Sequence, residues 1–379
     1  MDIYSSKVSP ALDFGAGAFL LVIAVLSIVG NLLILVMASK RSNHMKPPEL
    51  LSVNLAVTDL GAAVTMYPLA VASSWNHHWI GGHSTCYYYG FMGFFLGVTS
   101  IATLMVMAII RFSVSVNIQA PKEKVSKRCV KMLVAGTWLY ALLWAVLPFV
   151  GWGEYGPEPF GLSCTLAWGN LKTMKTGFSM IICMLIMNLV IPAVIIIFCY
   201  SAMAVKLYLT YKSIEDCQHI PSVVRLQRRL MIIAVLISLG FIGCWTPYAI
   251  VSLWSTFHDS ASIPPVVSML PCLFAKSSTV YNPLIYYAFS KPFKHEVKQL
   301  GRVCGWPGTC DANMANQTNA NGIYLVSTRS NLQNPAHVEN SALNNTQPQT
   351  ADYLQRRSRP SPAVTVDKNS SSHGPLNEH

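Results

Sequence analysis

The stretch Cys272-Leu-Phe-Ala-Lys-Ser-Ser-Thr-Val-Tyr-Asn-Pro-Leu-Ile-Tyr286 places one lysine, Lys276, in a segment that is otherwise uncharged from Ser260 to Ser290. A charge in the middle of a bilayer costs about 2.5–3.5 kcal/mol on insertion scales, so such residues usually face a bundle interior and have a functional role. An uncharged buried amine can condense with an aldehyde to form a Schiff base. Lys276 is therefore a candidate attachment point for an aldehyde, and the alternative is a structural lysine paired with a buried carboxylate.

Apolar segments of membrane-spanning length make up most of the chain around this stretch. Of the 379 residues, 52% are hydrophobic and 11% are charged, against about 25% charged in an average soluble protein. Five uncharged runs, each long enough to cross about 30 Å of hydrocarbon, are residues 14–39, 84–110, 132–153, 180–205 and 230–257. Residues 50–72, with Asp59, and the Lys276 segment contain single charges. We therefore predict an all-α membrane protein with a seven-transmembrane helix bundle.

The basic residues set the orientation of the predicted bundle, because Lys and Arg accumulate in cytoplasmic loops. If the N-terminus lies outside, the outer side holds only Lys7, Lys172 and Lys175, and the inner loops hold most of the others. We expect a multi-pass protein of the plasma membrane with an extracellular N-terminus. The formal charge of +11 then reflects topology and contact with anionic lipid, so a nucleic acid partner is not needed to explain it.

Two of the ten cysteines fall on the outer side of this topology. Cys86 begins the third span, and Cys164 lies in the loop after the fourth. The others lie within spans or on the cytoplasmic side. Since only this pair meets an oxidising compartment, we predict a disulfide between them, the alternative being two free outer thiols.

The chain divides into four parts on this basis. Residues 1–14 form an extracellular N-terminus, and residues 15–289 form the seven-helix bundle. Residues 290–303 alternate as an amphipathic helix lying on the inner membrane surface. Residues 304–379 are rich in Asn, Ser, Thr, Gln and Pro, which predicts a disordered cytoplasmic tail. Cys304, at the start of this tail, is a candidate for palmitoylation.

Small and aromatic residues suggest where a cavity lies. Gly93 and Gly97 have the small-xxx-small spacing of closely packed membrane helices, and the alternative use of their smooth face is a ligand cleft beside Phe94. In the sixth span, Pro247 frees a backbone carbonyl and makes a kink, which is a natural place for motion. Trp245 and Tyr248 flank this proline and can border one cavity.

These residues together resemble the rhodopsin-like G-protein-coupled receptors, and within them the opsins, over roughly residues 15–300. The matching features are Gly30-Asn31, residues 54–59, Cys86 with Cys164, Arg111, Trp138, Pro192, Tyr200, residues 244–248 and residues 282–286. A lysine six positions before Asn282-Pro283 is where opsins carry retinal. The outer loop over residues 157–165 looks like that of the neuropsin (opsin-5) group.

The resemblance implies a light-sensing receptor for non-visual photoreception that is not an enzyme and needs no metal. Its cofactor would be 11-cis or all-trans retinal, bound covalently as a Schiff base on Lys276. The residues around the retinal would be Tyr89, Gly93, Phe94, Gly97, Trp245 and Tyr248. The activation switch would comprise Asp59, Arg111, Tyr200, Asn282, Pro283 and Tyr286. The implied partners are a heterotrimeric G protein, with the Gi type as one candidate, the lipid bilayer, and arrestin and a receptor kinase at the tail.

The sequence departs from the family pattern around Arg111. The usual acidic residue before it is Ile110, the usual tyrosine after it is Phe112, and Gln227 stands where many members carry the glutamate that pairs with this arginine. Weak coupling, coupling in the dark and no G-protein signalling all stay open. The alternative function is a retinal photoisomerase with little or no coupling. A channel or transporter is less favoured because no internal repeat is visible, and a diffusible-ligand receptor would leave Lys276 unexplained.

The position of the counterion to a protonated Schiff base also departs from that of visual pigments. Tyr89 stands where vertebrate visual opsins carry a glutamate, and a neutral phenol cannot serve. Glu158, six residues before Cys164, matches the counterion of many non-visual opsins, and the alternative is a solvated loop carboxylate. Ultraviolet-absorbing neuropsins resemble one another in carrying a lysine where this chain has Tyr67. We therefore treat Tyr67 as a spectral-tuning candidate and expect a visible-absorbing pigment.

Overall fold

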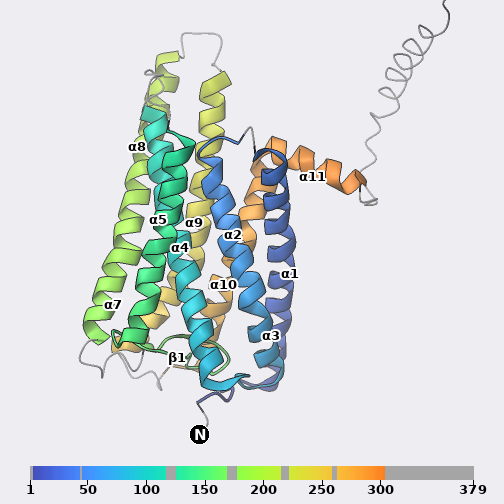
Figure 1. Ribbon diagram of the computed structural model, residues 1–379, viewed down its shortest axis with the longest axis vertical. Helices are drawn as coiled ribbons and strands as arrows, with labels where there is room; N and C mark the ends of the chain where they lie inside the picture. Colours follow the sequence, from blue (N-terminus) through green and yellow to red (C-terminus); the bar gives the residue numbers. More distant parts are fainter. Residues whose placement is uncertain are drawn as a thin grey trace, which may run out of the picture. The chain divides into compact units, whose positions relative to one another are not determined.

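The computed structural model describes residues 3–42, 45–116, 125–168, 177–214, 222–257 and 263–303. Over these residues, long helices pack side by side into a bundle, and a further short helix projects sideways from one end (Figure 1). The predicted seven-helix architecture is confirmed. The predicted tail, including Cys304, lies outside the described residues.

The seven helical columns follow the order of the chain. The first three columns are α1 (Pro10–Lys40), α2 (Glu49–Thr65) continued by α3 (Tyr67–Trp75), and α4 (Gly82–Val116). The fourth is α5 (Lys127–Val146), followed by the 3₁₀ turn η3 (Leu147–Val150). The fifth comprises α7 (Gly177–Leu185), the π-helical turn η4 (Ile186–Val190) and α8 (Ile191–Ile214). The last two are α9 (Ser222–Phe257) and α10 (Pro265–Phe289), and α11 (Lys291–Val303) follows them.

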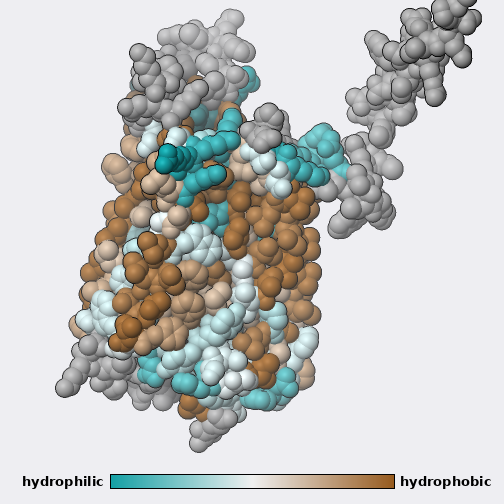
Figure 2. Space-filling model, in the orientation of Figure 1, coloured by the Kyte–Doolittle hydropathy of each residue, from teal (hydrophilic) through white to brown (hydrophobic). Residues whose placement is uncertain are grey.

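The surface of the bundle is suited to lipid. Six of the described columns are long and apolar enough to cross a membrane by length and composition, and Figure 2 shows apolar residues over the middle of the visible face, with hydrophilic ones toward its ends. The seventh column, α10, carries Lys276 and is rich in serine. It packs against α9 and α1, so protein covers the faces that hold these polar groups.

The first helix begins earlier than the uncharged run that predicted it. That run ended at Asp13 and placed the start at residue 14, whereas α1 starts at Pro10. Asp13 is fully buried, accepts a hydrogen bond from Ser6 Oγ at 3.0 Å and pairs with His77 Nδ1 at 2.9 Å. The hydrogen bond from Ser6 and the pairing with His77 offset the free energy that burial of this carboxylate costs. The helix can therefore extend toward the N-terminus beyond Asp13.

Prolines account for the other differences from the predicted spans. The second span is divided at Met66, because Pro68 lacks the N–H that would continue the hydrogen bonds of α2. The fourth run extended to residue 153, but α5 ends at Val146 and Pro148 lies in the 3₁₀ turn. Pro192 follows directly on the π-helical turn, whereas α9 continues through Pro247.

A short hairpin covers one end of the bundle. Strands β1 (Tyr155–Pro157) and β2 (Cys164–Leu166) pair antiparallel and lie at the end of the bundle opposite α11 (Figure 1). The N-terminal segment runs beside this turn: Trp79 N donates to Tyr4 O at 2.7 Å, and Lys7 N donates to Phe160 O at 3.3 Å. The hairpin is therefore packed between the helices and the N-terminal segment.

The hairpin turn requires glycine at residue 161. Gly161 has φ +88°, and a Cβ there would overlap the carbonyl of Ser5. Gly161→Ala should lower the free energy of unfolding by about 3 kcal/mol, since it adds a backbone clash to left-handed strain. Gly151→Ala is the matched control: φ is also +88°, but an added Cβ there meets no atom within 4 Å among the described residues other than its chain neighbours, so the cost should be about 1 kcal/mol. Equal melting temperatures for the two variants in detergent would contradict this.

Candidate functional site

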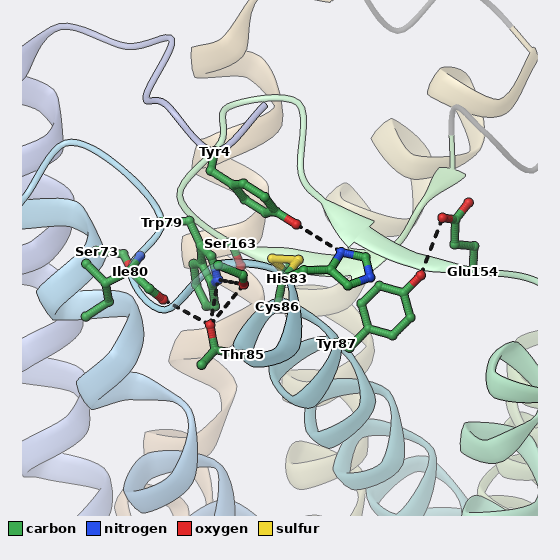
Figure 3. Close-up of a disulfide and its surroundings, with 12 residues drawn as sticks. Tyr4, Ser73, Trp79, Ile80, His83, Thr85, Cys86, Tyr87, Glu154 and Ser163 are labelled. Atoms are coloured by element: carbon green, nitrogen blue, oxygen red, sulfur yellow. Dashed lines mark hydrogen bonds between the residues drawn. A yellow bond between two sulfur atoms is a disulfide. The ribbon is translucent and has the colours of Figure 1, made fainter. Parts of the chain in front are cut away.

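A disulfide fastens the hairpin to the third helical column. Cys86 and Cys164 are bonded, which confirms the prediction, and Figure 3 shows the bridge between the start of α4 and the outer loop. Nearby, Trp79 Nε1 donates to Thr85 Oγ1 at 3.1 Å, and Tyr87 OH donates to Glu154 Oε1 at 3.4 Å (Figure 3). The disulfide and the Tyr87–Glu154 contact hold the hairpin and its loop over this end of the bundle, and the Trp79–Thr85 contact fixes the turn that precedes α4.

A mainly apolar cavity of about 240 Å³ lies beneath the hairpin. The structure brings together all the residues predicted to surround a ligand: Tyr89, Gly93, Phe94, Gly97, Trp245 and Tyr248. Lys276 and Glu158 also line the cavity. Gly93 serves both of the uses considered from the sequence. It lines the cavity, and it is closely packed, since an added Cβ would lie 2.9 Å from Met66 Cε. At Gly97 it would lie 3.7 Å from the Trp245 ring.

The amine of Lys276 has two hydrogen-bond acceptors in the cavity. Nζ donates to Cys272 Sγ at 2.7 Å and to Ser163 Oγ at 3.3 Å. In the part of the chain that the structure describes, no carboxylate lies within the 4.0 Å of an ion pair with this amine. The alternative of a lysine held by a structural ion pair is thus not supported.

Glu158 is buried beside this amine and not solvated. Its relative exposure is 5%, its Oε1 accepts a hydrogen bond from Tyr248 OH at 2.6 Å, and its N–H donates to Ser163 O at 2.8 Å. Burial raises the pKa of Glu158 to about 7, although the bond from Tyr248 and the charge of Lys276 act in the opposite direction. The carboxyl can therefore exchange a proton near neutral pH.

Ser163 and Cys272 were not predicted as site residues. Cys272 is four residues before Lys276 and so lies on the same helix face, a spacing that could have indicated the contact. Ser163 precedes the disulfide cysteine Cys164, but one serine in a loop is too common to carry a signal. Through its main chain and side chain, Ser163 connects Glu158 with Lys276.

Tyr67 contacts the backbone of the Lys276 turn. Its side chain is buried, and its OH donates to Lys276 O at 2.7 Å and lies 3.3 Å from Thr279 Oγ1. Tyr89 is on another side of the amine, with Lys276 Nζ 5.8 Å from its ring centroid. Tyr67 thus contacts the backbone of Lys276, and Tyr89 lies beside its amine.

Polar side chains continue from the cavity toward the other end of the bundle. Asn282 Nδ2 donates to Asp59 Oδ2 at 2.7 Å, and Tyr286 OH donates to Ser52 Oγ at 2.6 Å. Both contacts join α10 to α2. Pro283 packs against α1, where a Cβ on Gly30 would lie 2.7 Å from its ring.

Arg111 lacks the acidic partner that the resemblance drawn from the sequence would imply. Within the described ranges it forms no ion pair, and its buried Nε makes no hydrogen bond. Ile110 is buried in the apolar core. The ionisable groups that act on the guanidinium are the phenols of Tyr286 and Tyr200 and the carboxylate of Glu49. Glu49 was not anticipated from the sequence, because it lies in another helix, α2.

The family of the chain follows from comparison with known proteins. The description "7 transmembrane receptor (rhodopsin family)" belongs to the family whose sequence pattern matches residues 30–286. The chain is a member of this family. It is 36% identical to Opsin-5 of Mus musculus over 293 residues, which cover 77% of this chain and 78% of that protein. It is 32% identical over 277 residues to the visual pigment-like receptor peropsin of Mus musculus, covering 73% and 81%.

A solved structure agrees with these relatives. The crystal structure of squid rhodopsin superposes with a TM-score of 0.70 at 26% identity, covering 87% of this chain and 94% of that one. The predicted membership of the opsins, with greatest similarity to the opsin-5 group among the relatives compared, is confirmed. The protein is accordingly a multi-pass membrane receptor.

Proposed function

We propose that this opsin senses light with retinal bound as a Schiff base on Lys276. The observation that carries the proposal is the Lys276 amine facing a mainly apolar cavity, near a buried carboxyl but outside ion-pair distance of it. Such an amine has room to react with an aldehyde. The walls that would hold the polyene come from α4 and α9, chiefly Phe94, Gly97 and Trp245. When bound, retinal would supply a light-driven isomerisation, which needs no catalytic group of the chain.

We assign the counterion role to Glu158. A cation on Lys276 needs a negative partner in a site of low dielectric. Tyr248 OH donates to the Glu158 carboxyl, and Ser163 accepts both from the backbone N–H of Glu158 and from the Lys276 amine. Tyr248 OH also lies 3.2 Å from Thr165 Oγ1, so this phenol links the sixth column to the hairpin. The same arrangement allows Glu158 to take up or release a proton.

We propose that the signal passes along α9 and α10. Trp245 Nε1 donates to Ser278 Oγ at 3.3 Å, so a change in the cavity that moves this ring also acts on α10. The contacts of Asn282 with Asp59 and of Tyr286 with Ser52 continue to the end where Arg111 lies. A heterotrimeric G protein, with the Gi type as one candidate, would bind this end, which we assign to the cytoplasm; arrestin and a receptor kinase would bind the tail.

The second candidate is a retinal photoisomerase with little coupling, favoured by the unpaired Arg111. One experiment separates the two functions. The protein is reconstituted separately with 11-cis and all-trans retinal, spectra are recorded before and after light, and nucleotide exchange is measured on several G proteins including Gi. Light-dependent exchange supports the receptor, whereas isomerisation and release of retinal without exchange supports the photoisomerase.

The missing acid beside Arg111 predicts raised signalling in the dark. An arginine without a carboxylate partner is held less firmly in its resting position. Ile110→Glu should pair with it and lower dark nucleotide exchange severalfold, while Ile110→Gln, of similar size but neutral, should not. Dark exchange is measured with pigment reconstituted at equal concentration. A wild type that is silent in the dark and strongly active in light would show that the argument is wrong.

A further inference from the structure

Three polar groups that line the cavity have no hydrogen-bond partner within the described residues. They are the phenol oxygen of Tyr89, both polar atoms of the Asn188 amide and the indole nitrogen of Trp168. Buried polar groups are normally paired, so each exception calls for an explanation. Tyr89 lies beside Lys276 and belongs to the attachment site already described. Asn188 and Trp168 have no role in the proposed photochemistry.

Asn188 lies across the cavity from the attachment lysine. It is part of η4, in the fifth helical column, which runs along one edge of the bundle (Figure 1). Lys276 is in α10, which packs against α9 and α1 and lies toward the α1 side (Figure 1). A ligand that is linked to Lys276 and extends through the cavity therefore directs its far end toward Asn188.

The π-helical turn explains how a polar side chain comes to face this cavity. A π-helical turn inserts an extra residue into a helix and is frequent at functional sites. The neighbours Met187 and Leu189 are 42% and 37% exposed on the lipid-facing surface, whereas the polar atoms of Asn188 are buried. The amide thus lies among residues that otherwise suit lipid, and it lines the cavity.

The hydrogen-bonding groups at this end define the chemistry of a matching ligand. The Asn188 amide offers two N–H donors and a carbonyl acceptor, and the Trp168 indole offers one donor. The ring of retinal is a hydrocarbon and pairs with neither. A hydroxyl group both donates and accepts. We propose that the far end of the cavity selects a retinal that carries a hydroxyl group on its ring, bound by Asn188 and Trp168. The inference rests on the proposed attachment to Lys276.

The test compares two aldehydes that differ only at the ring. The full-length protein is titrated with retinal and with 3-hydroxyretinal of the same isomer, and the apparent affinity is read from pigment absorbance. We expect the wild type to bind the hydroxylated aldehyde about tenfold more tightly, as for one buried hydrogen bond gained. Asn188→Leu should abolish this preference and Trp168→Phe should reduce it. Trp152→Phe, which removes an indole N–H bonded to Ser179 outside the cavity lining, should keep it.

The outcomes separate this inference from the proposed function. Equal affinity of the wild type for the two aldehydes overturns the inference and leaves the attachment intact, as expected if water satisfies Asn188. A preference that persists in both Asn188→Leu and Trp168→Phe also overturns it. Absence of any pigment with either aldehyde overturns the attachment and the inference together. Pigment formation with unmodified retinal shows in each variant that the protein is folded.

Discussion

Lys276→Ala is expected to abolish the light-absorbing pigment. The amine is the only lysine nitrogen that lines the cavity in the described part of the chain, so its loss leaves the aldehyde without an attachment point. The pigment band should be absent at any retinal concentration that saturates the wild type. Reduction of the wild-type pigment with borohydride, followed by peptide mass spectrometry, should place the retinyl group on Lys276.

The control for this variant keeps the amine but changes its surroundings. Cys272→Ala removes the sulfur 2.7 Å from Nζ, one helical turn away, and should still give a covalent pigment. Equal cell-surface expression of the two variants would show that both fold. A normal pigment in Lys276→Ala would refute the assignment of the site as a whole.

Glu158→Gln is expected to convert a visible pigment to an ultraviolet one at neutral pH. Asp59 is the other carboxyl that lines the cavity among the described residues, and it is bonded to Asn282. Without Glu158 the Schiff base therefore lacks a negative partner in a site of low dielectric, and the linkage loses its proton. Chloride or bromide should partly restore the visible band by taking the place of the charge. The matched control is Glu154→Gln, because Glu154 is the other loop carboxyl and bonds to Tyr87; its spectrum should stay that of the wild type.

An unchanged spectrum in Glu158→Gln would place the counterion elsewhere. An ultraviolet-absorbing wild type would instead overturn the expectation based on Tyr67, which takes the place of the lysine in ultraviolet-absorbing neuropsins. The two results are distinguishable because the first concerns the variant and the second the wild type. Tyr67 OH donates a hydrogen bond to the backbone carbonyl of Lys276 at 2.7 Å. Substitution of Tyr67 would therefore also perturb the backbone of the attachment residue.

The same carboxyl predicts the pH dependence of stability in the retinal-free protein. Burial raises the pKa of Glu158 to about 7 in the folded state, above the value of about 4.3 in an unfolded chain. Its protonation therefore favours folding: the contribution is fully present below about pH 4.3 and is lost as the pH rises through 7. Near pH 4, Glu158→Gln should melt at the same temperature as the wild type. Near pH 8 it should melt at a higher temperature, because its free energy of unfolding should exceed that of the wild type by up to about 4 kcal/mol. Parallel melting curves across this range would contradict the burial argument.

Much of the fold could be predicted from composition and spacing. The apolar runs indicated the helical columns because each must cover the thickness of a bilayer, and the disulfide followed from the two cysteines on the outer side. The division of the second column at Met66 was not predicted, although Pro68 is the cause, because membrane helices often continue through proline, as α9 does at Pro247. The early start of α1 depended on partners of Asp13 that lie far away in sequence.

The candidate site was less visible in the sequence than the fold. Lys276 and Glu158 were found because a charge in an apolar segment and a carboxyl near a disulfide are rare. Ser163, Cys272 and Asn188 are ordinary polar residues, and only the folded chain brings them to the cavity. Arg111 is a different case, since substitutions around it indicated an unpaired guanidinium, but the proximity of Glu49 required the structure.

The backbone bonds of the N-terminal segment have a practical consequence for protein design. Tyr4, Ser6 and Lys7 pair through their main chains with Trp79, His77 and Phe160, so this segment is part of the wall around the outer mouth. An affinity tag fused ahead of Ile3 leaves those bonds in place. A deletion through Lys7 would uncover both the hairpin turn and the carboxylate of Asp13, so aqueous reagents would reach a face of the hairpin that the N-terminal segment now covers.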